Sequence, residues 1–97
     1  MSQLPPNPIF VRVSALPEAK LSEDEIVALD LNQEKYYGMS GPAARIWALL
    51  ETETTLDQLC TTLMVEFDVS KDVCLQQTQE FIDALLREQL IRIVTKR

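Results

Sequence analysis

The stretch "YYGMSGPAARIW", residues 36–47, contains the end of an expected strand and the start of an expected helix. Tyrosine is common in strands, whereas Pro42 fits the first turn of a helix, where its missing N–H costs nothing. Ser40 is placed to cap that helix. Apolar residues then recur at the three- and four-residue spacing of an amphipathic helix, at Ala43, Ile46, Trp47 and Leu50. The chain is therefore expected to change from sheet to helix at this junction.

The half of the chain that precedes the junction predicts three strands. Residues 9–14, 25–31 and 35–39 are rich in β-branched or aromatic residues, and the first of them alternates between apolar and polar positions. The polar "NQEK" predicts a hairpin turn before the third strand. The segment "ALPEAKLSEDE" predicts a polar connection between the first two. Strands of this length in succession favour an antiparallel meander.

The half that follows the junction predicts three helices. Thr55 and Gln58 form a T-x-x-Q capping box for the second helix, and Ser70 is placed to cap the third. The segment "LIRIV", residues 90–94, is β-prone, and the pattern leaves open whether it forms a short strand. The order predicts an α+β fold, a three-stranded antiparallel sheet followed by a three-helix bundle, similar to a winged helix.

The length fits one domain. Residues 9–94 are expected to form it, and the proline-containing residues 1–8 are expected to be a flexible tail. The N-terminus lacks the basic and apolar regions of a secretory signal, and no apolar run approaches the roughly 20 residues that span a bilayer. The expected location is cytoplasmic, without a membrane partner.

The residues that most enzymes use are scarce in this sequence. Histidine is absent, and the two glycines form no phosphate-binding loop. Cys60 and Cys74 lack the spacing of a metal site and fall on apolar helix faces, so they are expected in the core. We therefore expect no enzyme activity, no metal and no cofactor.

Three classes of binding protein remain to be compared. The net charge of −6 and an acidic third helix oppose a winged-helix DNA-binding regulator, so no nucleic-acid partner is expected. A carrier protein would need a serine in a D-S-L context, which the sequence lacks. An open sheet edge can instead bind an extended peptide as an added strand. The same edge could also pair with a second copy, which leaves a monomer and an edge-strand dimer open.

Two segments, "LDLNQEKYYGMSGPAARIWALL" and residues 55–91, resemble the PqqD-like family of peptide-recognition domains. The matching features, in order, are an acid at a strand end, a tyrosine-bearing strand, an Ile-Trp helix, a T-x-x-Q helix start and the aromatic-Asp-Val break at residues 67–69. The tyrosine strand is most similar to the stand-alone leader-binding proteins of lasso-peptide clusters. Met39, Ser40 and Gln89 depart from the leucine, asparagine and glycine that are frequent at these places.

The resemblance implies a function without catalysis or cofactor. Members of this family bind the leader segment of a ribosomally made precursor peptide against the third strand, in a groove walled by the third helix. They deliver it to a modifying enzyme: a leader protease and cyclase in lasso pathways or, as the alternative, a radical SAM enzyme in PqqD-type pathways.

The expected peptide-binding residues come from the third strand and the third helix. Alternation along the strand puts Tyr37 and Met39 on one face and Tyr36 and Gly38 on the other, and Trp47 is expected in the core instead. The face of the third helix that lines the groove is not decided by its apolar stripe. On the family resemblance, the expected site is Tyr36, Tyr37, Gly38, Met39, Leu75, Thr78, Ile82 and Leu86.

Overall fold

The computed structural model describes residues 8–13 and 16–94. The expected tail, residues 1–8, therefore lies outside the described residues except for Pro8. The elements in order are β1 (Ile9–Arg12), β2 (Glu18–Ser22), β3 (Glu25–Asp30), β4 (Lys35–Ser40), α1 (Pro42–Leu49), β5 (Thr54–Thr55), α2 (Leu56–Glu66), α3 (Lys71–Arg87) and β6 (Ile91–Val94). This order confirms the α+β class.

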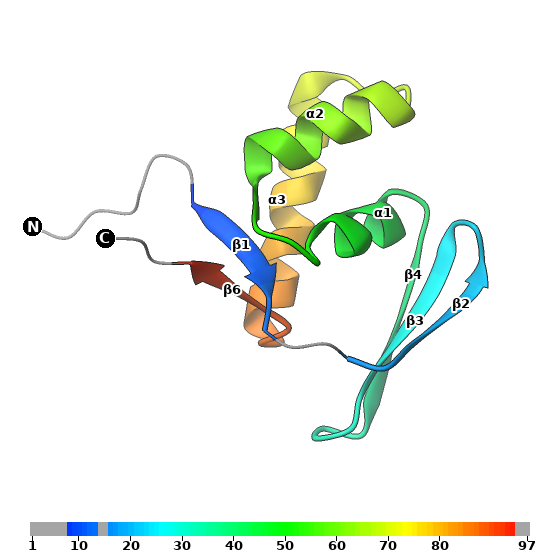
Figure 1. Cartoon of the computed structure of the whole chain (residues 1–97). Coiled ribbons are helices and arrows are strands. Elements are labelled where there is room, and N and C mark those ends of the chain that lie inside the picture. Colours follow the sequence, from blue (N-terminus) through cyan, green and yellow to red (C-terminus); the bar gives the residue numbers. More distant parts are fainter. Residues whose placement is uncertain (1–7, 14–15, 95–97) are drawn as a thin grey trace, which may run out of the picture.

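The strands form two antiparallel sheets (Figure 1). One has the order β2-β3-β4 and is the expected three-stranded meander that precedes the helices. The other has the order β5-β1-β6, because the C-terminal segment forms a strand that pairs with β1 from Ile9–Val94 to Arg12–Ile91.

The predicted membership of the meander was wrong at its first strand. Residues 9–12 belong to the other sheet, and the predicted polar connection instead supplies β2. All five residues of β2 are exposed, and the charged Glu18 and Lys20 in "EAKLS" are typical of an edge strand.

The helices begin where local signals place them, with one correction. The Thr55–Gln58 capping box and the Ser70 cap are both present, and Pro42 is the first residue of α1. The cap of α1, however, is Gly41 and not Ser40. Gly41 has a φ of 58°, a left-handed conformation that glycine adopts without the Cβ penalty of other residues.

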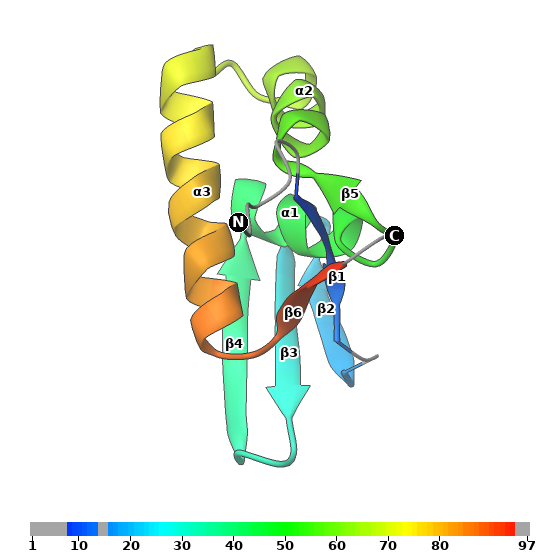
Figure 2. The same cartoon turned by 90° about the vertical axis from the view of Figure 1, so that its left-hand side faces the viewer.

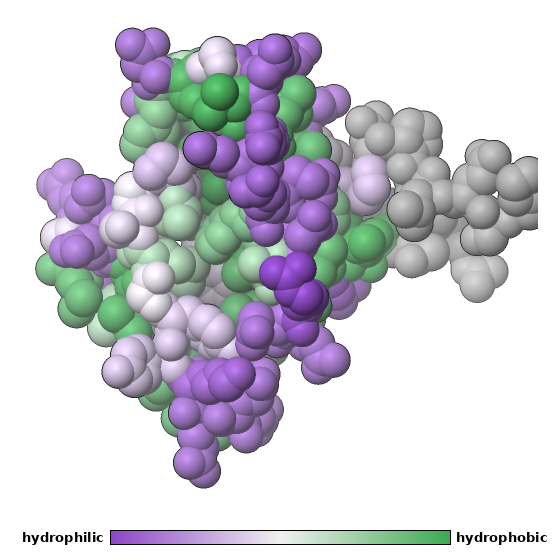
Figure 3. Space-filling view, turned by 180° about the vertical axis from the view of Figure 1, so that it is seen from behind, coloured by the Kyte–Doolittle hydropathy of each residue, from purple (hydrophilic) through white to green (hydrophobic). Residues whose placement is uncertain are grey.

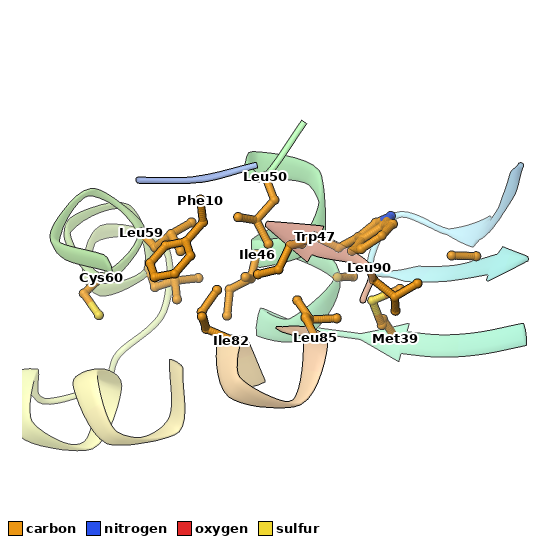
Figure 4. Close-up of a cluster of buried hydrophobic side chains, with 14 of the residues drawn as sticks. Phe10, Met39, Ile46, Trp47, Leu50, Leu59, Cys60, Ile82, Leu85 and Leu90 are labelled. Carbon is orange, nitrogen blue, oxygen red and sulfur yellow. The ribbon is translucent and has the colours of Figure 1, made fainter. Parts of the chain in front are cut away.

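The core lies where the helices cover the inner face of the meander and the second sheet. Trp47 and Ile82 have no exposed surface, and Met39, Leu85 and Leu90 point into the same cluster (Figure 4). Cys60 and Cys74 are buried free thiols, as expected. No helix in the described part of the chain is both long and apolar enough to cross a membrane.

Candidate functional site

β4 is an edge strand. Opposite residues of an antiparallel pair alternate between those that exchange backbone hydrogen bonds and those whose groups point outward. The Gly41 N–H donates to the Asp24 carbonyl at 2.8 Å, and the β3–β4 register continues from there without a shift. The alternation therefore directs the backbone N–H and C=O groups of Tyr36, Gly38 and Ser40 away from β3, along what we call the β4 edge.

The other side of β3 gives the same alternation. The Leu29 N–H donates to the Pro17 carbonyl at 2.8 Å, so residue 29 faces β2 while residues 28 and 30 face β4. The C-terminal strand β6 is committed to β1. Within residues 8–13 and 16–94, no strand covers the β4 edge.

The two tyrosines of β4 face opposite sides of the sheet. Tyr36 is 75% exposed on the outer face, whereas Tyr37 is half-buried on the inner face and packs against the core. Met39, on the same face as Tyr37, is 7% exposed and belongs to the core. The outer face of β4 is thus accessible, and the inner face is covered as far as Tyr37.

One flank of α3 approaches β4 (Figure 2). At the helix C-cap, Glu88 accepts a hydrogen bond from the Tyr37 hydroxyl at 3.1 Å and lies 3.6 Å from the Lys35 ammonium. Helical spacing places Phe81 and Ala84 on the same flank as Glu88. Figure 3 looks onto this side of the molecule, where pale and partly hydrophobic surface lies beside the hydrophilic exposed face of α3.

The contact between Tyr37 and Glu88 joins β4 to the end of α3. Burial, and then the neighbouring carboxylate, raise the pKa of Tyr37 above its ordinary value. The Tyr37 hydroxyl therefore remains protonated and able to donate its hydrogen bond at neutral pH.

An apolar pocket of about 220 Å³ lies beyond the Ser40 end of β4. Its walls come from the start of α1, the end of α2 and the flank of α3 that carries Phe81. The lining residues are Pro42, Ala43, Ile46, Leu63, Phe67, Val69, Cys74, Gln77, Thr78 and Phe81. A pocket of this size and lining accepts an apolar side chain. It lies next to backbone groups that can pair with an extended chain.

The expected site residues on β4 form the edge, but those on α3 are dispersed. Thr78 and Ile82 are 2% and 0% exposed, and only Thr78 touches the pocket. Leu75 and Leu86 lie about a third of a turn from Phe81, on the other flank of the helix. The structure therefore brings to β4 the flank that the sequence analysis did not choose.

Five residues beside the β4 edge or in the pocket are not among the residues expected from the sequence. Glu88 contacts β4, and the pocket is lined in part by Phe81, Gln77, Pro42 and Ala43. Phe81 is part of the apolar stripe of α3, but the stripe alone does not say which of its two flanks faces the sheet. Lys35 and Glu88 have opposite charges and lie 3.6 Å apart, but they are distant in the sequence, and nothing local indicates that they pair.

The geometry offers backbone pairing and an apolar pocket, and no group of three or more metal-ligating side chains occurs among the described residues. No curated protein matches the chain. A solved structure, described as TbiB1 in complex with the TbiA(β) leader peptide, matches with a TM-score of 0.76 and 24% identity, over 89% of this chain and 99% of that one. That likeness shows the fold. The family model described as coenzyme PQQ synthesis protein D (PqqD) matches residues 25–91, more than half of the sequence, and the chain therefore belongs to the PqqD family.

Proposed function

We propose that this chain is a non-catalytic binding protein for the leader segment of a ribosomally made precursor peptide. The leader adds to the β4 edge as a fourth strand of the meander and places an apolar side chain in the pocket between α1, α2 and α3. The chain then delivers the leader to a modifying enzyme, the leader protease and cyclase of a lasso-peptide pathway.

The observation that carries this proposal is the open β4 edge beside an apolar pocket. The outward backbone groups of Tyr36, Gly38 and Ser40 can form about four strand hydrogen bonds, each with a net contribution of about 0.5–1.5 kcal/mol. An apolar side chain buried in the pocket adds about 1.5–3 kcal/mol. After the cost of association and of ordering the peptide, an affinity between micromolar and nanomolar follows.

The resemblance of the fold to a protein described in complex with a leader peptide supports the binding of a leader peptide by this chain. The family model carries the name of a coenzyme PQQ synthesis protein, which favours a second candidate: a peptide chaperone that partners a radical SAM enzyme. Both candidates require the same peptide-binding edge, and they differ only in the enzyme that receives the peptide.

The test removes one donor from the β4 edge without disturbing the β3–β4 ladder. Gly38→Pro deletes an outward N–H, and proline is tolerated on edge strands where the N–H faces away from the sheet. Lys20→Pro is the matched control, because it deletes an outward N–H on β2, the opposite edge of the same sheet.

The probe is a displayed library of random peptides long enough to cover the six residues of β4. Peptides enriched on the unmodified protein are synthesised and measured by calorimetry. We expect Gly38→Pro to weaken binding about two- to ten-fold and Lys20→Pro to leave it unchanged, with both variants folded by circular dichroism. Equal affinity for the Gly38→Pro variant, or no enrichment at all, contradicts the proposal.

A further inference from the structure

Gly38 lies in the interior of β4, where a glycine is costly. Glycine loses more backbone freedom on folding than other residues and provides no side chain to pack, so it weakens a strand. It is usually found there for one of four reasons: a left-handed backbone, a bulge, crowding by neighbouring atoms, or the close approach of a ligand. The first three can be checked in the structure.

None of the three internal reasons applies to Gly38. Gly41 has a left-handed φ, whereas Gly38 does not. The register between β3 and β4 runs from Glu25–Ser40 to Asp30–Lys35 without a bulge. A Cβ atom built on Gly38 would meet no other described atom within 4 Å. The free protein would therefore accept a larger residue at this position.

The neighbours of Gly38 on the outer face of the sheet are small or apolar, and the space directly above it is open. Directly across on β3 is Val27, half-buried, and beyond it on β2 is the small residue Ala19. Tyr36, two residues earlier on β4, points to the same face and is 75% exposed. The space above Gly38 therefore has Val27 at its inner side and an aromatic ring at one end.

We propose, on the basis of the proposed function, that Gly38 selects a peptide with an aromatic residue at the position that pairs with it. The aromatic side chain lies flat across Gly38, against Val27 and beside Tyr36. Strands lie about 4.8 Å apart, so the side chain must reach across one strand to touch Val27, and an aromatic ring has that reach. Aromatic residues are known to compensate for a cross-strand glycine in this way.

The experiment measures the coupling between Gly38 and the aromatic residue of the peptide. The display selection on the unmodified protein is repeated on a Gly38→Val variant, and an enriched peptide is synthesised with its aromatic residue and with alanine in its place. Ala19→Val is the matched control, because it adds the same kind of bulk on the other side of Val27, away from the β4 edge.

In the unmodified protein and in Ala19→Val, we expect replacement of the aromatic residue by alanine to weaken binding about ten-fold. In Gly38→Val, the same replacement should weaken binding about two-fold or less, because the introduced valine side chain occupies the space above residue 38 and keeps the aromatic ring from Val27. The midpoint of thermal unfolding should not fall in Gly38→Val, since a β-branched residue suits a strand better than glycine.

Two results would overturn the inference while leaving the proposed function intact. The first is enrichment of peptides without an aromatic preference at any fixed position. The second is an equal effect of the alanine replacement in the unmodified protein and in Gly38→Val. Failure of the proposed function is recognisable separately, because the unmodified protein then enriches no peptide, or enriches peptides that bind Gly38→Pro equally well.

Discussion

Tyr36 and Tyr37 are adjacent in the sequence and have different surroundings. The Tyr36 ring lies on the outer face of the sheet, 75% exposed, and the Tyr37 ring lies on the inner face with its hydroxyl on Glu88. Alternation along a strand makes this division predictable. Which of the two tyrosines faces the core is not predictable, because that depends on which face of the sheet α3 covers. Tyr36 is therefore the tyrosine available to a ligand on the outer face.

Cys60 and Cys74 show how burial changes the chemistry of single residues. Their exposed fractions are 2% and 3%, and the Cys74 thiol lies 3.9 Å from the Cys60 carbonyl oxygen, between α2 and α3. Burial, and then the neighbouring Cys74, raise the pKa of Cys60 to about 11. The thiol remains protonated at neutral pH and behaves as a small apolar group.

The raised pKa of Cys60 predicts a loss of stability at high pH. The unfolded chain releases this proton near pH 8.5, and the folded chain retains it to about pH 11, so the unfolded state is favoured as the pH rises between these values. The free energy of unfolding should fall by up to about 1 kcal/mol per pH unit in this range. Urea denaturation of the unmodified protein and of Cys60→Ala between pH 8 and pH 11 measures it. The same slope in both proteins would contradict the prediction.

The C-terminal end of α3 has the hydrogen bonds of a Schellman motif with an unusual residue in it. The Gln89 N–H donates to the Leu86 carbonyl and the Leu90 N–H to the Leu85 carbonyl, both at 3.0 Å. Gln89 has a φ of 62°, a conformation that glycine adopts freely and other residues at a cost. The motif lies between Glu88, which contacts β4, and Ile91, where β6 begins. The unfavourable backbone conformation of Gln89 is therefore next to the candidate site.

Replacing Gln89 with glycine should therefore stabilise the protein. We expect Gln89→Gly to raise the free energy of unfolding by about 1 kcal/mol, because the left-handed backbone no longer carries a Cβ. Gln76→Gly is the control: Gln76 is exposed within α3, and glycine there should lower stability by about 1 kcal/mol. A loss of stability in both variants, measured by urea denaturation, would disprove the strain at Gln89.

At the scale of elements, helices were more predictable than strands. The capping box at Thr55, the Ser70 cap and the apolar stripes are encoded within a few residues, so they can be recognised locally. The Gly41 cap was missed because its left-handed φ leaves Ser40 in β4 rather than at the helix start. β6 pairs with β1, which is distant in sequence, and β2 is exposed throughout. With four and five residues, both strands are too short for their alternation of polar and apolar residues to identify them locally.

Across the whole molecule, Arg12 joins the two sheets through α1. Its guanidinium stacks over the Trp47 ring at 4.2 Å, donates to the Trp47 carbonyl at 2.6 and 3.1 Å, and pairs with Glu18 at 3.3 Å. The Trp47 indole N–H also donates to Glu18 at 3.1 Å. A strand of each sheet and a helix thus meet at these three side chains.

Loss of this junction should destabilise the fold without involving the β4 edge. Arg12→Ala removes a partly buried stack and leaves the Trp47 carbonyl without the two donors, so we expect a loss of about 2–3 kcal/mol in the free energy of unfolding. Arg92→Ala on the exposed side of β6 should change it by less than about 0.5 kcal/mol. Equal stabilities for the two variants would show that the junction contributes little.

Only part of the candidate site could be predicted from the sequence. The open β4 edge was predictable, because strand order and alternation follow from a local hairpin. The flank of α3 beside it was not, since the flank that carries Leu75 and Leu86 is the more apolar one, and only the packing of the whole chain brings the flank of Glu88 to β4. The sequence also left open whether residues 90–94 form a strand. In the structure they supply β6, which pairs with β1 and not with β4.

Pairing of a peptide with the β4 edge can be followed at single residues by site-resolved amide hydrogen exchange. The protein is measured alone and with a peptide enriched in the display selection. We expect the outward amides of Tyr36, Gly38 and Ser40 to become protected on binding, while those of Glu18 and Lys20, at the opposite edge, do not change. Unchanged exchange at the three β4 amides in the peptide-bound protein, or protection at the β2 edge instead, would contradict this pairing.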